Sequence, residues 1–99
     1  MLKINDLKVG DYISLRYITS YNDYRFVGQV TRIDLNYDTI FVDGIKYQND
    51  ELSIIEVWAM DYVFLHSCKL ITEKQYQEVE KCHREETITD EVREFLKNI

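Results

Sequence analysis

Short runs in which apolar and polar residues alternate occupy the first 57 residues, and polar turn-like segments separate them. In residues 11–18, Ile13, Leu15 and Tyr17 alternate with their neighbours, which is the period of a half-buried β-strand. Such a pattern favours a small β-rich fold over a helical one.

Further strands are expected along the same stretch. Residues 24–33 form a second strand, and its internal Gly28 indicates a bend. Asp43-Gly44 is a strong turn signal, so we expect a hairpin between residues 39–42 and 45–47. A fifth short strand is predicted at residues 54–57. Five short, bent strands favour a small closed barrel, because an open sheet would expose its edges.

Three segments carry a family resemblance: "LKVGDYI", "FVGQV" and "SIIEV". Their order resembles the SH3-like small β-barrel and is similar to that of small phage proteins of the YopX type. The resemblance implies that the loop after the first strand, residues 18–24, contacts partners.

The remainder of the chain reads as helical. Thr72 and Gln75 form a capping box, and Thr89 caps a second helix. Residues 58–68 are ambiguous between strand and helix, and we favour helix. "KLITEKQY" resembles the turn of a short helical hairpin. The predicted class is therefore α+β: a five-stranded SH3-like barrel over residues 1–57, then two to three short helices. These form an acidic helical hairpin, residues 58–99, packed on the barrel or on a partner.

The composition indicates one intracellular domain. The 99 residues are 45% hydrophobic, with no apolar run near the roughly 18 residues needed to span a bilayer. No signal peptide is recognisable, and two cysteines without a disulfide framework fit a reducing compartment. We therefore expect a cytoplasmic protein with no membrane contact. The absence of proline and the single alanine suggest an AT-rich genome, such as that of a low-GC bacterium or its phage.

No enzyme motif is present, so we expect a non-enzymatic protein without cofactors. The residues His66, Cys68, Cys82 and His83 could in principle supply zinc ligands, but their spacing matches no zinc pattern, and we expect no metal. We expect two buried or half-buried cysteines and two surface histidines.

Tyrosines and a carboxylate in the first loop are the leading candidate site. Tyr17, Tyr21, Asp23 and Tyr24 are the predicted partner-binding residues, because tyrosine offers a large rigid contact area with a polar tip. The competing interpretation, of equal weight, is that some of these rings cover the open end of the barrel.

Three arginines support an alternative. Arg16, Arg25 and Arg32 fall on polar strand positions and could form a basic–aromatic face for single-stranded nucleic acid. The net charge of −6 disfavours this hypothesis. It gains if the arginines share an exposed face free of aspartate, and it weakens if they pair with aspartates.

Two other surfaces could also contact partners. The acidic helices could imitate a phosphate backbone, although a solvated helix face is the commoner case. Trp58, Met60 and Phe64 could form a homodimer face rather than core.

The sequence thus predicts a small protein-binding module encoded by a phage or mobile element, which acts as an adaptor or steric inhibitor of a host protein, for example as an anti-defence protein. The alternative is a nucleic-acid-binding regulator.

Overall fold

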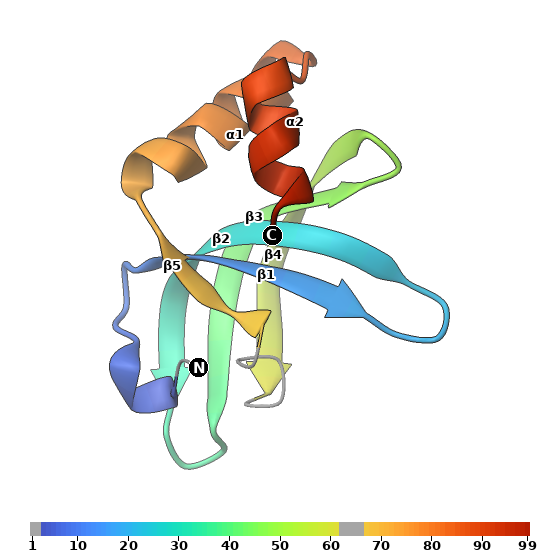
Figure 1. Ribbon diagram of the computed structural model, residues 1–99. Helices are drawn as coiled ribbons and strands as arrows, with labels where there is room; N and C mark the ends of the chain where they lie inside the picture. The colour runs from blue at the N-terminus through green and yellow to red at the C-terminus, as the bar shows by residue number, and fades with distance from the viewer. Residues whose placement is uncertain (1–2, 62–66) are drawn as a thin grey trace.

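The computed structural model describes residues 3–61 and 67–99, which form a five-stranded antiparallel sheet and two C-terminal helices (Figure 1). The elements, in chain order, are η1 (Ile4–Asp6), β1 (Tyr12–Ile18), β2 (Asp23–Asp34), β3 (Thr39–Gln48), β4 (Glu51–Asp61), β5 (Lys69–Ile71), α1 (Glu73–Glu85) and α2 (Asp90–Lys97). The predicted α+β class is confirmed.

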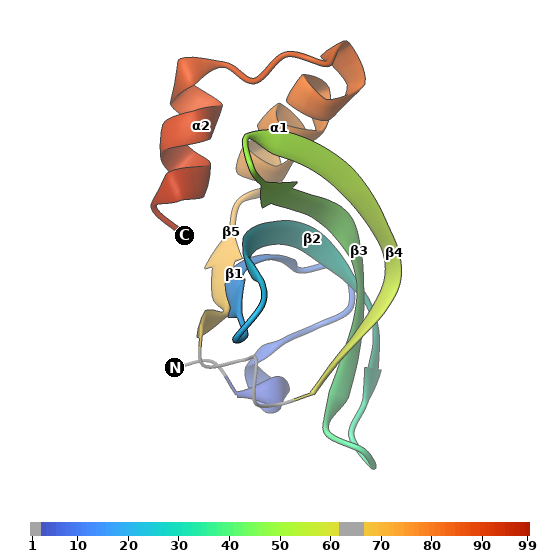
Figure 2. The same ribbon diagram turned by 90° about the vertical axis from the view of Figure 1, so that its right-hand side faces the viewer.

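The strands are ordered β4-β3-β2-β1-β5, so the chain runs as a meander and then returns to pair β5 with β1. In Figure 2 the strands curve around one side of the molecule, and both helices lie at one end of the sheet. Among the described residues the ladders leave β4 and β5 at the two edges, so the closed SH3-like barrel stays a prediction.

Two clusters of buried side chains lie on opposite faces of the curved sheet. The first cluster comprises Leu7, Ile13, Leu15, Phe26, Val30, Ile40, Val42, Met60 and Cys68. The second, which the helices cover, comprises Val27, Ile45, Tyr47, Val79, Cys82, Val92 and Leu96. We call them the inner cluster and the helix-side cluster. A sheet that is buried on both faces shows apolar neighbours in sequence, which explains the adjacent Phe26 and Val27.

A pair of glycines allows the sheet to bend. Gly28 and Gly44 are cross-strand neighbours on β2 and β3. A Cβ at Gly28 would lie 2.5 Å from Cζ of Phe26, and one at Gly44 would lie 2.6 Å from the same atom. The ring therefore occupies the space that two side chains would need.

The predicted hairpin at Asp43-Gly44 is wrong, because both residues lie inside β3, which runs unbroken from Thr39 to Gln48. The turn lies instead at Asn49 and Asp50, with φ angles of 54° and 58°. Two central residues with positive φ make the type of two-residue loop that matches strand twist, and Asn and Asp tolerate this conformation.

Irregular pairing increases the curvature. The β2–β3 register shifts between Val30 and Arg32, and the β3–β4 register shifts between Val42 and Gly44. The second shift inserts a residue in β4, where Val57 has a φ of 52° and its N–H donates to Oδ1 of Asp43 over 2.6 Å. Bulges of this kind bend the strand and strengthen its twist.

The helix favoured at residues 58–68 is wrong over its first part, because Trp58 to Asp61 continue β4. Residues 62–66 lie outside the described part of the chain. Met60 is buried and Trp58 packs against the inner cluster, so these two side chains are core and not a dimer face. Phe64 lies outside the described residues.

The prediction that "KLI" begins the turn of a helical hairpin is also wrong, because these residues form β5. The sheet therefore extends beyond residue 57, where the sequence placed the start of the helical segment.

Both helix starts are confirmed. Oγ1 of Thr72 accepts from the Gln75 N–H over 3.0 Å while the Gln75 side chain accepts from the Thr72 N–H over 2.9 Å. Oγ1 of Thr89 accepts from the Val92 N–H over 3.2 Å. Neither α1 nor α2 has the length and apolar character to cross a membrane, and the same holds throughout residues 3–61 and 67–99.

The glycine pair yields a prediction. Gly44→Ala should destabilise the fold by about 2 kcal/mol or more, because the new methyl group would clash with backbone atoms. It would lie 2.6 Å from Cα of Gly28 and would also overlap the backbone oxygen of Val27. Urea denaturation followed by circular dichroism measures the change. Ser53→Ala, on an exposed position of β4, is the control and should change stability by less than about 0.5 kcal/mol. Equal midpoints for the two variants would contradict the packing argument.

Candidate protein-binding surfaces

The tip of the β1–β2 hairpin is an ordered turn. The Thr19 N–H donates to the carbonyl oxygen of Asn22 over 2.7 Å. Oγ1 of Thr19 accepts from the Asn22 N–H over 2.9 Å and from the Tyr21 N–H over 3.2 Å. One threonine thus accepts from two backbone donors of the turn, which limits its conformational freedom.

Two large apolar side chains point outward from this tip. Tyr21 is 94% exposed and Ile18 is 59% exposed. Their surroundings, residues 19, 20, 22 and 23, are exposed as well. The tip therefore presents an apolar pair on a rigid polar turn.

Tyr17 and Tyr24 have a different environment from Tyr21. Their rings stack at 4.9 Å, and Trp58 meets Tyr17 edge-on at 5.6 Å and lies 6.1 Å from Tyr24. Nζ of Lys46 lies 5.2 Å from the Tyr24 ring, and burial raises the pKa of Tyr24. Both rings are half-buried, so they support the base of the hairpin while Tyr21 extends beyond it.

Asp23 is held at the same base by arginine. Nε and Nη2 of Arg16 donate to its two carboxylate oxygens over 2.9 and 2.7 Å, and Nη1 of Arg25 lies 3.9 Å from Oδ1. The hydrogen bonds from Arg16, together with the positive charges of both arginines, lower the pKa of Asp23. A bidentate pair of this kind fixes orientation as well as charge.

All three arginines of the alternative nucleic-acid face have a carboxylate neighbour. Besides the contacts of Arg16 and Arg25 with Asp23, Nη2 of Arg32 lies 3.6 Å from Oδ2 of Asp34. The guanidinium of Arg32 also lies 4.9 Å from the centre of the Phe41 ring. These pairings reduce the positive potential that a phosphate backbone would need.

The cysteines are placed apart. Cys68 belongs to the inner cluster and Cys82 to the helix-side cluster. Burial raises the pKa of Cys68 to about 12, so its thiol stays protonated near neutral pH. Within the described part of the chain, no three His, Cys, Asp or Glu side chains are grouped to hold a metal ion, and His66 lies outside it.

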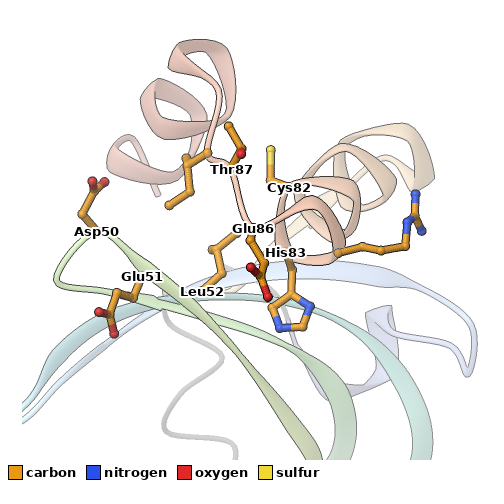
Figure 3. Close-up of a pocket in the computed structure, with 9 residues that line it drawn as sticks. Asp50, Glu51, Leu52, Cys82, His83, Glu86 and Thr87 are labelled. Atoms are coloured by element: carbon orange, nitrogen blue, oxygen red, sulfur yellow. The ribbon is translucent and has the colours of Figure 1, made fainter.

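A cleft that the sequence did not suggest lies between the β3–β4 turn and the end of α1 (Figure 3). Its volume is about 690 Å³. His83 and Glu86 extend from the end of α1 toward Leu52, and Asp50 and Glu51 stand on the strand side. Residues this far apart in sequence give no local signal that they share a cleft.

A second hollow, of about 130 Å³, continues along β4 and is lined in part by Ile54, Glu56, Tyr76 and Glu80. His83 lines both hollows, and both lie between β4 and α1. We call the two hollows together the β4 groove.

A hydrogen-bonded clamp holds one end of the β4 groove. Nε of Arg93, on α2, donates to Oδ1 of Asp50 over 2.9 Å, and Nη2 donates to Oδ2 over 3.4 Å. The Tyr47 hydroxyl donates to Oδ1 over 3.0 Å. Hydrogen bonds from Arg93 and Tyr47 lower the pKa of Asp50. The clamp ties the β3–β4 turn to the helices.

Comparisons with known proteins give no match, whether with protein-family models, with curated proteins or with solved structures. Two surfaces are therefore candidates for function on their geometry alone: the exposed hairpin tip and the β4 groove.

The Arg16–Asp23 pair predicts a pH dependence. The folded-state pKa of Asp23 is lower than its ordinary value of 3.8. The pairing therefore stabilises the fold fully above that value, and this contribution is lost as the pH falls through the lowered pKa. Arg16→Gln should raise the pKa of Asp23 toward its ordinary value. A carboxyl-carbon NMR titration of both proteins measures the shift, and an unchanged Asp23 midpoint would contradict the assigned cause.

Proposed function

We propose that this chain is a non-enzymatic cytoplasmic protein-binding module that acts as an adaptor or steric inhibitor of a host protein. The observation that carries the proposal is the exposed pair Tyr21 and Ile18 on the hydrogen-bonded tip of the β1–β2 hairpin. A phage or mobile-element origin and an anti-defence role belong to the same proposal.

A rigid turn that displays a tyrosine and an isoleucine suits protein recognition. Tyrosine buries a large area with few rotatable bonds, and an ordered turn loses little conformational entropy on binding. Thr19 orders the turn, and the stacked Tyr17 and Tyr24 stiffen its base. The paired charges of Arg16 and Asp23 beside it would form a polar rim.

The SH3-like barrel and the similarity to small phage proteins of the YopX type are also part of this proposal. The return of β5 to pair with β1 and the strong curvature of the sheet support it. In that family of folds the loop after the first strand contacts partners, and here that loop includes Tyr21.

A nucleic-acid-binding regulator is the second hypothesis. The carboxylate neighbours of all three arginines, together with the net charge of −6, give it less support than protein binding.

The test is affinity capture from the lysate of a low-GC bacterium, with and without nuclease. The double variant Ile18→Ser/Tyr21→Ser should retain the captured protein at least about tenfold less well than the wild type, because it removes the central apolar contacts. Quantitative mass spectrometry of the retained proteins measures the loss.

Leu35→Ser/Tyr37→Ser is the matched control, since Leu35 and Tyr37 are 62% and 78% exposed on the β2–β3 turn at the opposite end of β2. Equal retention by the two double variants would rule out the hairpin tip as the binding site. Material lost on nuclease treatment would favour the nucleic-acid hypothesis.

A further inference from the structure

The outer edge of β4 has backbone groups that face away from the sheet. Gln48 and Glu51 flank a two-residue loop, where the flanking residues form a hydrogen-bonded pair. Alternate residues therefore direct their N–H and C=O groups away from β3, and along this edge these are Leu52 and Ile54.

This edge remains open within the described structure. Among residues 3–61 and 67–99, no backbone hydrogen bond joins residues 51–56 to an element other than β3. The bulge at Val57 then ends the regular edge after Glu56. The open segment is therefore one short strand length, and an exposed row of this kind is a template for an added strand.

The β4 groove provides room and apolar contacts beside that edge. Leu52 lines the larger hollow and Ile54, 57% exposed, lines the smaller one. From α1, Tyr76, Glu80 and His83 face the edge at helical spacing. A strand added to β4 would therefore place alternate side chains against Leu52, Ile54 and Tyr76.

The carboxylates that line the β4 groove favour a positively charged partner strand. Asp50 is paired with Arg93, and Glu80 lies 3.8 Å from Arg84. Glu51, Glu56 and Glu86 also line the groove, and within the described part of the chain none of these three has an ion-pair partner. The groove thus combines unpaired backbone donors and acceptors with an excess of negative charge.

We propose that the free edge of β4 binds an extended segment of a partner protein in which lysine or arginine alternates with apolar residues. The segment adds a strand at residues 51–56 and sets its apolar side chains on Leu52 and Ile54. Because side chains alternate faces along a strand, the cations on its opposite face lie beside Glu51, and cations just beyond the apolar residues meet Glu56 and Glu86. A second copy of β4 fits poorly, because it would bring its own Glu51 and Glu56 against these carboxylates. This site shares no residue with the hairpin tip.

The probe is a fluorescently labelled peptide that alternates lysine and valine, and fluorescence anisotropy reports its binding to the full chain. Two control peptides accompany it: one has glutamate for lysine, and the other is N-methylated at alternate backbone nitrogens. The wild type should bind the first peptide more weakly at high salt and should bind neither control. N-methylation tests the backbone hydrogen bonds without altering the protein.

Protein variants test the charges and the edge separately. Glu51→Lys/Glu56→Lys should weaken binding by about tenfold, from two lost charge pairs and the repulsion that replaces them. Glu78→Lys/Glu85→Lys is the matched control, because it makes the same change in net charge on the opposite face of α1, where both residues are exposed. It should bind within about twofold of the wild type.

Ile54→Pro should abolish binding, because it removes an N–H that faces outward and is not used in the β3 ladder. Circular dichroism verifies that this variant is folded. If it is not, the N-methylated peptide still tests whether binding uses backbone hydrogen bonds. Ile18→Ser/Tyr21→Ser should bind the peptide as the wild type does.

Three results would each overturn the proposal. They are no binding of the lysine–valine peptide by the wild type, equal binding of the N-methylated peptide, and equal weakening by the two lysine double variants. Sedimentation velocity adds a fourth: a dimer that Ile54→Pro dissociates would assign the edge to a second copy of the chain.

Discussion

The Phe26 ring lies over the cross-strand pair Gly28–Gly44, and the curvature of the sheet depends on this contact. Because neither glycine has a Cβ, the ring can lie close to the backbone of both strands, and Trp58 then meets its edge at 5.1 Å. An aromatic ring that covers strand glycines restores the contacts that the glycines lack. The bend encloses the inner cluster on one face and leaves the other face to the helices, so a chain of 99 residues buries two sets of apolar side chains.

The bend also determines where the candidate surfaces lie. It brings the β3–β4 turn under the helices, where Asp50 meets Arg93 and Tyr47. The clamp holds the turn against α2 and leaves the β4 groove between the strand edge and α1 (Figure 3). Because the clamp lies on the surface, it adds little to the free energy of unfolding. Its main effect is to fix the position of the β3–β4 turn relative to α2.

Local signals predicted those parts of the fold that local physics determines. Alternation identified β1 and most of β2, and the hydroxyls of Thr72 and Thr89 identified both helix starts.

The turn predicted at Asp43-Gly44 is wrong because Gly44 is needed for close packing against Phe26 and not for a turn. The positions of Trp58 and Met60 fit both a helical and a strand pattern. They lie in a strand because their side chains contact residues that are distant in sequence. β5 has only three residues and exists because β1 is beside it. Of the predicted site, the exposure of Tyr21 was open from the sequence, and the β4 groove had no local signal at all.

The two surfaces lie at the same end of the sheet, and this bears on the choice between adaptor and inhibitor. In an antiparallel meander the β1–β2 and β3–β4 turns share one end, and the β2–β3 turn lies at the other. The C-terminal part of α2 lies near both, because Arg25 donates to the carbonyl oxygen of Lys97 over 3.4 Å while Arg93 holds Asp50. One partner that contacts both surfaces would gain from the high effective concentration of the second contact. Within the proposal of a protein-binding module, contact of one partner with both surfaces corresponds to a steric inhibitor rather than to an adaptor. The unpaired carboxylates of the groove would attract a basic segment from a distance, and the apolar hairpin tip would supply contacts that salt does not weaken.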